Sequence, residues 1–281
     1  MAKEKDKKLK EKYNIETGYF EDGLPFTRMG DKPRIILSID SLNGDHVPLS
    51  GFMLKQFVKT AKILAQDYTI YHVCRKPNLP DDYLMNNMAD DYAEMIKREF
   101  KDPVDVMGAS TGGQIAHFLA ADYPDLVRKL VIISAAYRLS DKGVEIEGRA
   151  EKYAEQGKMG KAMATLIELI YPSGIKRSIM KFFVRLLGKM MMGDIEYPND
   201  YLVEIRADRA MNFKDRLHEI KAPTLIVSGE LDVGYTAEDV RVTAEGIPNA
   251  ELILYEGYGH NLMLANHNQI FNDILAFLRK E

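Results

Sequence analysis

A serine flanked by glycines is the side chain best placed for chemistry in this sequence. Ser110 lies in the segment Gly108-Ala109-Ser110-Thr111-Gly112, after the run VDVM and before the helical pattern QIAHFLAADY. Glycine neighbours allow a sharp strand-to-helix turn, which holds such a serine in a strained conformation. The first amides of the following helix favour negative charge that develops there. The pentapeptide alone is a weak signal, but its context predicts Ser110 as a nucleophile.

A serine hydroxyl needs a base to remove its proton, and His260 is the best candidate. His260 follows the apolar segment ELILY across a glycine-bearing loop, where functional residues commonly lie in parallel sheets. Asp232 follows the segment TLIVS and is predicted to orient the histidine; Glu230 is a near alternative. The order Ser110, Asp232, His260 is the order that one serine-hydrolase architecture uses.

Short apolar runs alternate with helical patterns along most of the chain. The runs lack polar alternation, as strands buried on both faces do, so they predict a doubly wound, mostly parallel α/β sheet. The predicted strands are 34–39, 68–73, 103–107, 130–134, 224–228 and 251–255, and the predicted helices between or after them are 84–100, 111–122 and 269–279.

The alternation stops after Ser134, and no convincing strand occurs until about residue 216. Helical patterns at 147–170, 175–192 and 200–213 fill the gap. We therefore predict a charged N-terminal tail at 1–13, an α/β core at 14–137 and 216–281, and a helical cap at 138–215. The cap is rich in methionine, which suits either helix packing or a pliable pocket lining.

The composition is ordinary for a soluble globular protein. Hydrophobic residues make up 46% and charged residues 28%, and the net charge of −4 does not favour nucleic acid as a partner. No run approaches the roughly 18 apolar residues of a membrane span. The lone cysteine, Cys74, and the charged start of the chain favour a cytoplasmic location. We expect a monomer or homodimer, with no metal and no cofactor.

Three segments together resemble the α/β-hydrolase superfamily, specifically its cap-bearing branch of esterases, lactonases and carbon–carbon hydrolases. These segments are GASTGG around Ser110, APTLIVSGELD ending at Asp232, and GYGH ending at His260. The resemblance covers roughly residues 30–137 and 215–281. It implies the α/β-hydrolase fold and catalysis by a Ser110, His260 and Asp232 triad.

The loop after the first predicted strand departs from the family pattern. The family usually has His-Gly there, leading the loop whose amide completes the oxyanion hole, whereas this chain has Ile39-Asp40. The resemblance implies the amides of Thr111 and of Ser41 (or Leu42) as oxyanion donors. Backbone amides do not depend on side-chain identity, and we expect the Asp40 carboxylate to point away or to hold the loop.

The sequence thus predicts a serine hydrolase that cleaves an ester or related acyl bond of a small, largely apolar substrate. It leaves open whether the protein is an esterase, lactonase, thioesterase, carbon–carbon hydrolase or perhydrolase. Phe182, Phe183, Leu186 and Leu187 are candidates for the pocket lining or for the core of the cap. The alternative from another class is a non-catalytic, hydrolase-like protein that binds a ligand or signals.

Overall fold

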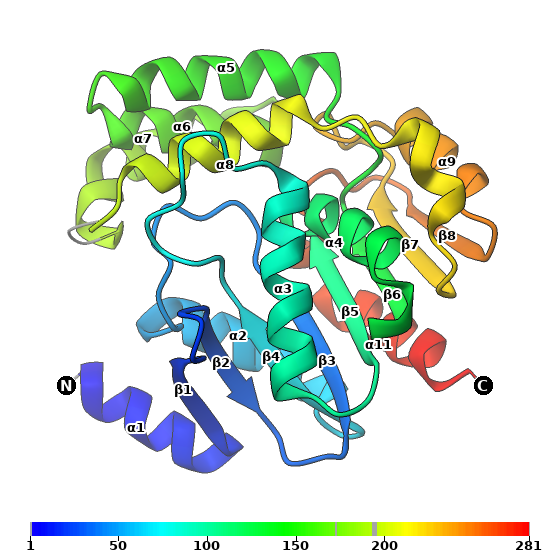
Figure 1. Cartoon of the computed structure of the whole chain (residues 1–281). Helices are drawn as coiled ribbons and strands as arrows, with labels where there is room; N and C mark the ends of the chain where they lie inside the picture. The colour runs from blue at the N-terminus through cyan, green and yellow to red at the C-terminus, as the bar shows by residue number, and fades with distance from the viewer. Residues whose placement is uncertain (1, 172, 193–195, 281) are drawn as a thin grey trace.

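The core is one eight-stranded sheet flanked by helices, seen in a computed structural model that describes residues 2–171, 173–192 and 196–280 (Figure 1). The strand order is β1-β2-β4-β3-β5-β6-β7-β8, in which β1 and β2 pair antiparallel and the strands from β4 to β8 pair parallel. The strands are β1 Ile15–Tyr19, β2 Pro25–Met29, β3 Arg34–Ile39, β4 Tyr68–Val73, β5 Val104–Ala109, β6 Val127–Ile133, β7 Thr224–Gly229 and β8 Ala250–Tyr255. The predicted doubly wound fold is confirmed.

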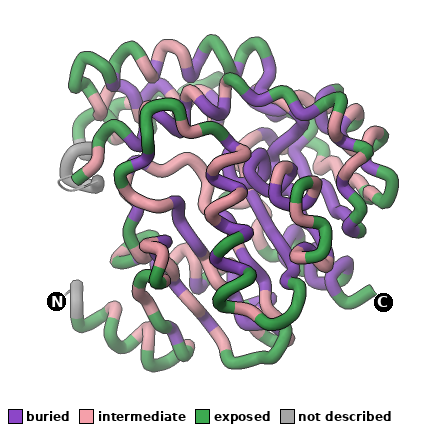
Figure 2. Tube along the Cα trace, viewed as in Figure 1, coloured by how far each residue is buried: buried purple, intermediate pink, exposed green. Residues whose placement is uncertain are grey.

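Helices cover both faces of the sheet, because its central strands are apolar on both sides. Helices α2 (Gly51–Leu64) and α11 (His267–Arg279) enclose one hydrophobic cluster. Helices α3 (Met85–Glu99), α4 (Thr111–Asp122) and α9 (Ala237–Gly246) enclose the other. Figure 2 shows the central strands as a buried layer through the middle of the molecule. The short helix α10 (Leu262–Ala265) precedes α11, and 3₁₀ turns occupy Pro124–Leu126 and Lys214–Glu219.

Four helices form the upper layer in Figure 1, above the sheet. They are α5 Asp141–Glu155, α6 Met159–Ile170, α7 Ile175–Met192 and α8 Asn199–Ala210. All four fall within the segment predicted as a cap. The single helix expected over 147–170 is two helices, because the chain turns at Gly157, whose φ of 68° favours glycine.

The charged N-terminal segment is helical and packs against the core. Residues Ala2–Tyr13 form helix α1, and the Asp6 carboxylate accepts a bond of 2.7 Å from the Gly51 amide at the start of α2. Leu9 and Tyr13 pack against the cluster beneath α2 and α11. The hairpin of β1 and β2, which the sequence analysis did not predict, then extends the sheet beyond β4. Among the described residues no helix is both long and apolar enough to cross a membrane.

Candidate active site

Ser110 lies on the turn between β5 and α4, as its flanking glycines predicted. Its φ of 53° is in the left-handed region, which costs energy for a residue with a side chain. A Cβ on Gly108 would lie 2.3 Å from the Gly112 carbonyl oxygen, and a Cβ on Gly112 would lie 2.5 Å from the Ile39 carbonyl oxygen. Both glycines are therefore needed for the close packing that holds the turn.

The structure brings Ser110, His260 and Asp232 together from three separate loops. The His260 Nε2 atom lies 3.1 Å from Ser110 Oγ, and Nδ1 lies 2.8 Å from an Asp232 oxygen. The other Asp232 oxygen accepts the amides of Gly234 and Tyr235 at 2.9 and 3.1 Å. Asp232 is thus buried and fixed in orientation, with one oxygen left to hold the imidazole.

The surroundings of His260 favour its protonated form. Burial by itself lowers the pKa of the imidazole, but the charge and hydrogen bond of Asp232, with the charge of Asp208, raise it above its usual value. The Tyr235 ring stacks on the imidazole with centroids 5.8 Å apart. A raised pKa and a fixed carboxylate partner both suit His260 for accepting a proton from Ser110.

The loop after β3 carries the predicted oxyanion donor Ser41, but the amide of this residue already has an acceptor. The Ser41 N–H donates to the Asp40 carboxylate at 2.9 Å, while the Ser41 hydroxyl donates to the Ala109 carbonyl at 3.2 Å. The second Asp40 oxygen accepts from the Asn43 side chain at 2.9 Å. Asp40 therefore holds its own loop, and the alternative donor named from the sequence, the Leu42 amide, is the next one along the chain.

Arg75 joins this loop to the cap. It is 1% exposed, and its guanidinium donates to the carbonyls of Asp40 and Ser41 at 2.5 and 2.7 Å. It also donates to both oxygens of Glu204, on cap helix α8, at 2.9 and 2.5 Å. Two carbonyls fixed toward Arg75 turn the neighbouring amides of the loop the other way. Nothing in the sequence around Arg75 predicts these contacts.

Asp208, one turn further along α8, contacts the turn between β5 and α4 that carries Ser110, here called the nucleophile turn. Its carboxylate accepts the hydroxyls of Thr111 at 2.5 Å and of Tyr235 at 3.1 Å, and the Gln114 side chain donates to the same tyrosine oxygen at 3.0 Å. The Ser110 hydroxyl is also a hydrogen-bonding neighbour of Tyr235. Asp208 thus contacts the turn that carries Ser110 through Thr111 and Tyr235, a contact that sequence analysis missed.

Asp208 is one of two buried acids that face each other in the cap. Burial raises the pKa of Asp208 to about 6, although the bonds from Thr111 and Tyr235 oppose this shift. Burial and the charge of Asp208 raise the pKa of Glu147, on α5, well above its usual value. One Glu147 oxygen has no hydrogen-bond partner among the described residues. Burial thus shifts the pKa of both groups upward, toward protonation at a higher pH than usual for a carboxyl.

Three side chains under the loop could hold a cation but form a hydrogen-bonded group instead. The ligand atoms of Asp40, His72 and Cys74 lie within 4.8 Å of one another, a proximity that their spacing in the sequence did not reveal. The Cys74 thiol donates to Asp40 at 3.5 Å, and burial raises its pKa well above the usual value. A protonated thiol beside a carboxylate balanced by Arg75 is a poor metal ligand set.

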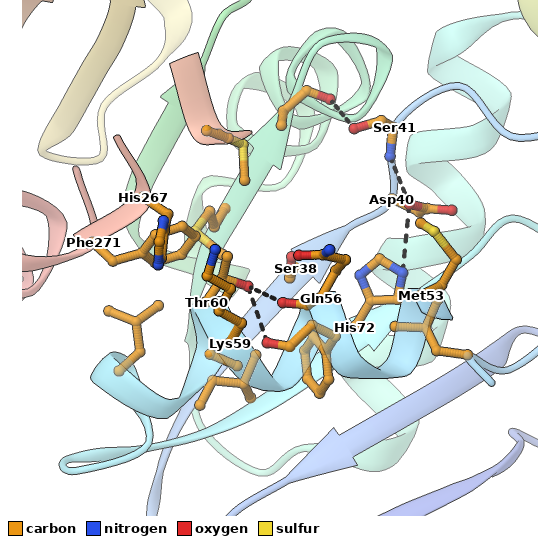
Figure 3. A pocket seen from close by; sticks show the side chains of 18 of the residues that line it. Ser38, Asp40, Ser41, Met53, Gln56, Lys59, Thr60, His72, His267 and Phe271 are labelled. Carbon is orange, nitrogen blue, oxygen red and sulfur yellow. Dashed lines mark hydrogen bonds and ion pairs between the residues drawn. The ribbon is translucent and has the colours of Figure 1, made fainter. Parts of the chain in front are cut away.

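A cavity of about 200 Å³ is lined by Asp40 and Ser41 of the loop and by Ala109, the residue before Ser110, but by none of Ser110, Asp232 and His260 themselves. Figure 3 shows Ser41 and Asp40 at one end and His267 and Phe271 at the other. An apolar cavity of about 150 Å³ is large enough to hold a benzene ring. Apolar side chains form most of its wall: Leu49, Met53, Phe57, Leu64, Ile70, Met107, Met263, Leu264 and Phe271.

The aromatic residues considered for the pocket lining lie elsewhere. Phe182, Phe183 and Leu186 are 62%, 49% and 64% exposed on the outside of α7, so neither the lining nor the core of the cap contains them. The side chains of Leu187 and of Met190, Met191 and Met192 lie outside the described residues. Their spacing is typical of a packed helix, but spacing alone does not say which way the helix faces.

The matching family model identifies the class of protein. Residues 81–266 match the model of the serine aminopeptidase S33 family, which is a family of α/β-hydrolases, and the chain belongs to it. The match includes the nucleophile turn, the four cap helices and both predicted triad partners.

Individual relatives have varied hydrolytic activities. RutD of Rhizobium rhizogenes, whose name assigns it carbamate hydrolysis, is 29% identical over 72% of this chain and 77% of its own. The bifunctional esterase/perhydrolase DCH of Acinetobacter calcoaceticus is 26% identical over 73% of this chain and 78% of its own. The enol-lactonase of Burkholderia xenovorans has the same fold, with a TM-score of 0.73 at 16% identity over 94% of this chain and 100% of its own.

Proposed function

We propose that this protein is a serine hydrolase that cleaves a carboxylic ester or related acyl bond of a small, largely apolar substrate. The observation that carries the proposal is the position of His260, which lies 3.1 Å from Ser110 and 2.8 Å from Asp232. The family supports hydrolysis of ester, carbamate or lactone bonds in general. The cavity beside the nucleophile turn supports an apolar substrate.

The geometry suits acyl transfer in two steps. His260 takes the proton of Ser110 as the serine oxygen attacks the carbonyl carbon, and it then gives that proton to the leaving group. Water, activated by the same histidine, next releases the acid from the acyl-enzyme. Asp232 keeps the imidazole in the tautomer that presents a free Nε2 to the serine.

The oxyanion would form between two backbone amides. The Thr111 N–H heads helix α4 and therefore has no acceptor within that helix. For the second donor we favour Leu42 over Ser41, because the Ser41 amide is bonded to Asp40. Removing one such donor typically costs about 10²–10³ in rate, so the loop that Arg75 fixes is important for turnover.

The test is labelling with a fluorophosphonate probe together with turnover of p-nitrophenyl esters of increasing chain length. We expect the native protein to be labelled and to hydrolyse esters. Ser110→Ala should not be labelled, and His260→Ala should lose about 10⁴ or more in rate, while both keep the native circular dichroism spectrum. Asn261→Ala, next to the histidine, is the control that should retain activity.

A native protein that is neither labelled nor active on any ester would contradict the proposal. The non-catalytic alternative would then explain the triad residues as a binding surface. Labelling without turnover of esters would keep the nucleophile but move the substrate to another acyl compound, such as a lactone or carbamate.

A further inference from the structure

Cap helix α7 presents its apolar face to solvent. Ile175, Ile179, Phe182 and Leu186 are 79%, 48%, 62% and 64% exposed. Their spacing of four, three and four residues places them in one stripe along the helix. Large apolar side chains scattered singly on a surface are common, but a contiguous stripe marks a contact surface.

The charged residues of α7 itself are all positive. Lys176 and Arg185 are exposed and project about 90° to either side of it, at 100° per residue. The whole of α7, Ile175–Met192, contains no acidic residue, although the chain as a whole has a net charge of −4. Lys181 points the other way and pairs with Glu168 of α6 at 2.6 Å. The positive charge is therefore a local property of this face.

We propose that this face of α7 docks onto a lipid surface that carries anionic headgroups. An apolar stripe bordered by lysine and arginine is the pattern of a helix that lies in the plane of a membrane interface. The stripe would enter the boundary of the acyl chains, and the flanking cations would lie among the phosphates of the anionic headgroups. A second copy of this chain is a poorer occupant, because two such faces would bring like charges together.

Docking of α7 goes beyond the proposed function and does not depend on it, since no triad residue takes part. It would bring the cap of the enzyme to the membrane, where apolar esters concentrate. The test is flotation of the full-length protein with vesicles of phosphatidylcholine containing about 30% phosphatidylglycerol, compared with phosphatidylcholine alone.

The decisive variant is Ile179→Glu/Phe182→Glu, with Val144→Glu/Tyr153→Glu as its matched control. The control makes the same change of charge at two partly exposed apolar positions, 36% and 37%, on cap helix α5. We expect the native protein and the control to float with the anionic vesicles. The α7 variant should bind at least about tenfold more weakly, and raised salt should weaken native binding.

Three results would overturn the proposal. The first is that the native protein fails to bind anionic vesicles, and the second is that the α7 variant binds them as well as the control does. The third result is a native dimer by light scattering that Ile179→Glu/Phe182→Glu converts to a monomer, which would assign the face to contact between copies. Ester turnover, measured in the same samples without vesicles, reports separately on the triad.

Discussion

Two helices of the cap depart from the usual distribution of residues in opposite ways. Helix α8 buries three acids at intervals of four residues, Asp200, Glu204 and Asp208, each no more than 2% exposed. Helix α7 exposes four large apolar residues at helical spacing, from Ile175 to Leu186. Both patterns are costly for an isolated domain, so each one points to something that compensates for it.

For α8 the compensation lies within the molecule. Asp200 accepts the amides of Asn78 and Leu79, each at 2.8 Å, which fixes the loop after β4. Glu204 pairs with Arg75, and Asp208 binds the nucleophile turn through Thr111. The three acids thus hold three parts of the active site in order along one helix. The four apolar residues of the α7 stripe are exposed and not covered by any other part of the described structure, so we infer an external partner for them.

The largest effect should come from the middle acid of α8. Glu204→Gln removes the negative charge that faces Arg75 and the buried His46. Burial by itself lowers the pKa of His46, but the charge and hydrogen bond of Glu204, with a hydrogen bond to Asp200, raise the pKa to about 9. Breaking a buried pair while its partner stays charged costs about 3–5 kcal/mol. We expect a loss of this size in urea denaturation, together with slower probe labelling of Ser110.

The control for this prediction is Glu155→Gln, whose partner Arg206 is 2.8 Å away but whose side chain is 47% exposed. Exposed pairs contribute at most about 1 kcal/mol. Equal losses of unfolding free energy in the two variants would show that the buried pair of Glu204 and Arg75 is no more important than an exposed one.

A smaller, pH-dependent effect should come from Asp208. Its pKa in the folded protein, about 6, lies above the usual value for aspartate near about 3.9. The resulting stabilisation is therefore fully present below about pH 4 and is lost as the pH rises through 6. The native protein should therefore lose on the order of 2–3 kcal/mol of unfolding free energy between pH 4 and pH 7.5. Asp208→Asn mimics the neutral carboxyl and should not show this loss.

Urea denaturation at those two pH values checks this prediction. Glu147 and His260 titrate together with this carboxyl, and the charge of Glu204 acts on it, so the comparison is between variants and not with a single-site curve. Asp141→Asn, at a side chain that is 95% exposed, should follow the native protein. If Asp208→Asn also runs parallel to the native profile, burial does not control this group.

Much of the fold could be predicted because buried strands have a local signature. The runs at 34–39 and 68–73 coincide with β3 and β4, since apolar residues without alternation require a layer on each face. The β1–β2 hairpin was missed because the segment IETGY is short, polar and half exposed at a sheet edge. Glycine and strand context likewise located Ser110, Asp232 and His260, which the structure places within hydrogen-bonding distance.

The roles of α7 and α8 could not be predicted in the same way. A buried acid is recognised by its partner, and Arg75 and Glu204 are 129 residues apart in the chain. The spacing of Asp200, Glu204 and Asp208 was visible, yet it also fits a solvated helix face. The stripe of α7 has the same periodicity as that of α11, which is buried, so the pattern alone does not say which way a helix faces.

The smallest expected effect tests that last distinction. Phe182 of α7 is 62% exposed and Phe271 of α11 is 2% exposed. Phe271→Ala should lower the free energy of unfolding by about 3–5 kcal/mol, as loss of a core phenylalanine does. Phe182→Ala should change it by less than about 1 kcal/mol, the limit for a side chain whose main contact is the neighbouring Phe183 ring, 5.8 Å away. Urea denaturation at two protein concentrations makes the comparison complete, since a contact between copies would make the midpoint depend on concentration. A small, concentration-independent effect leaves the α7 face free in the lipid-free protein, as docking requires, whereas a loss as large as that of Phe271→Ala would mean that the stripe is already covered.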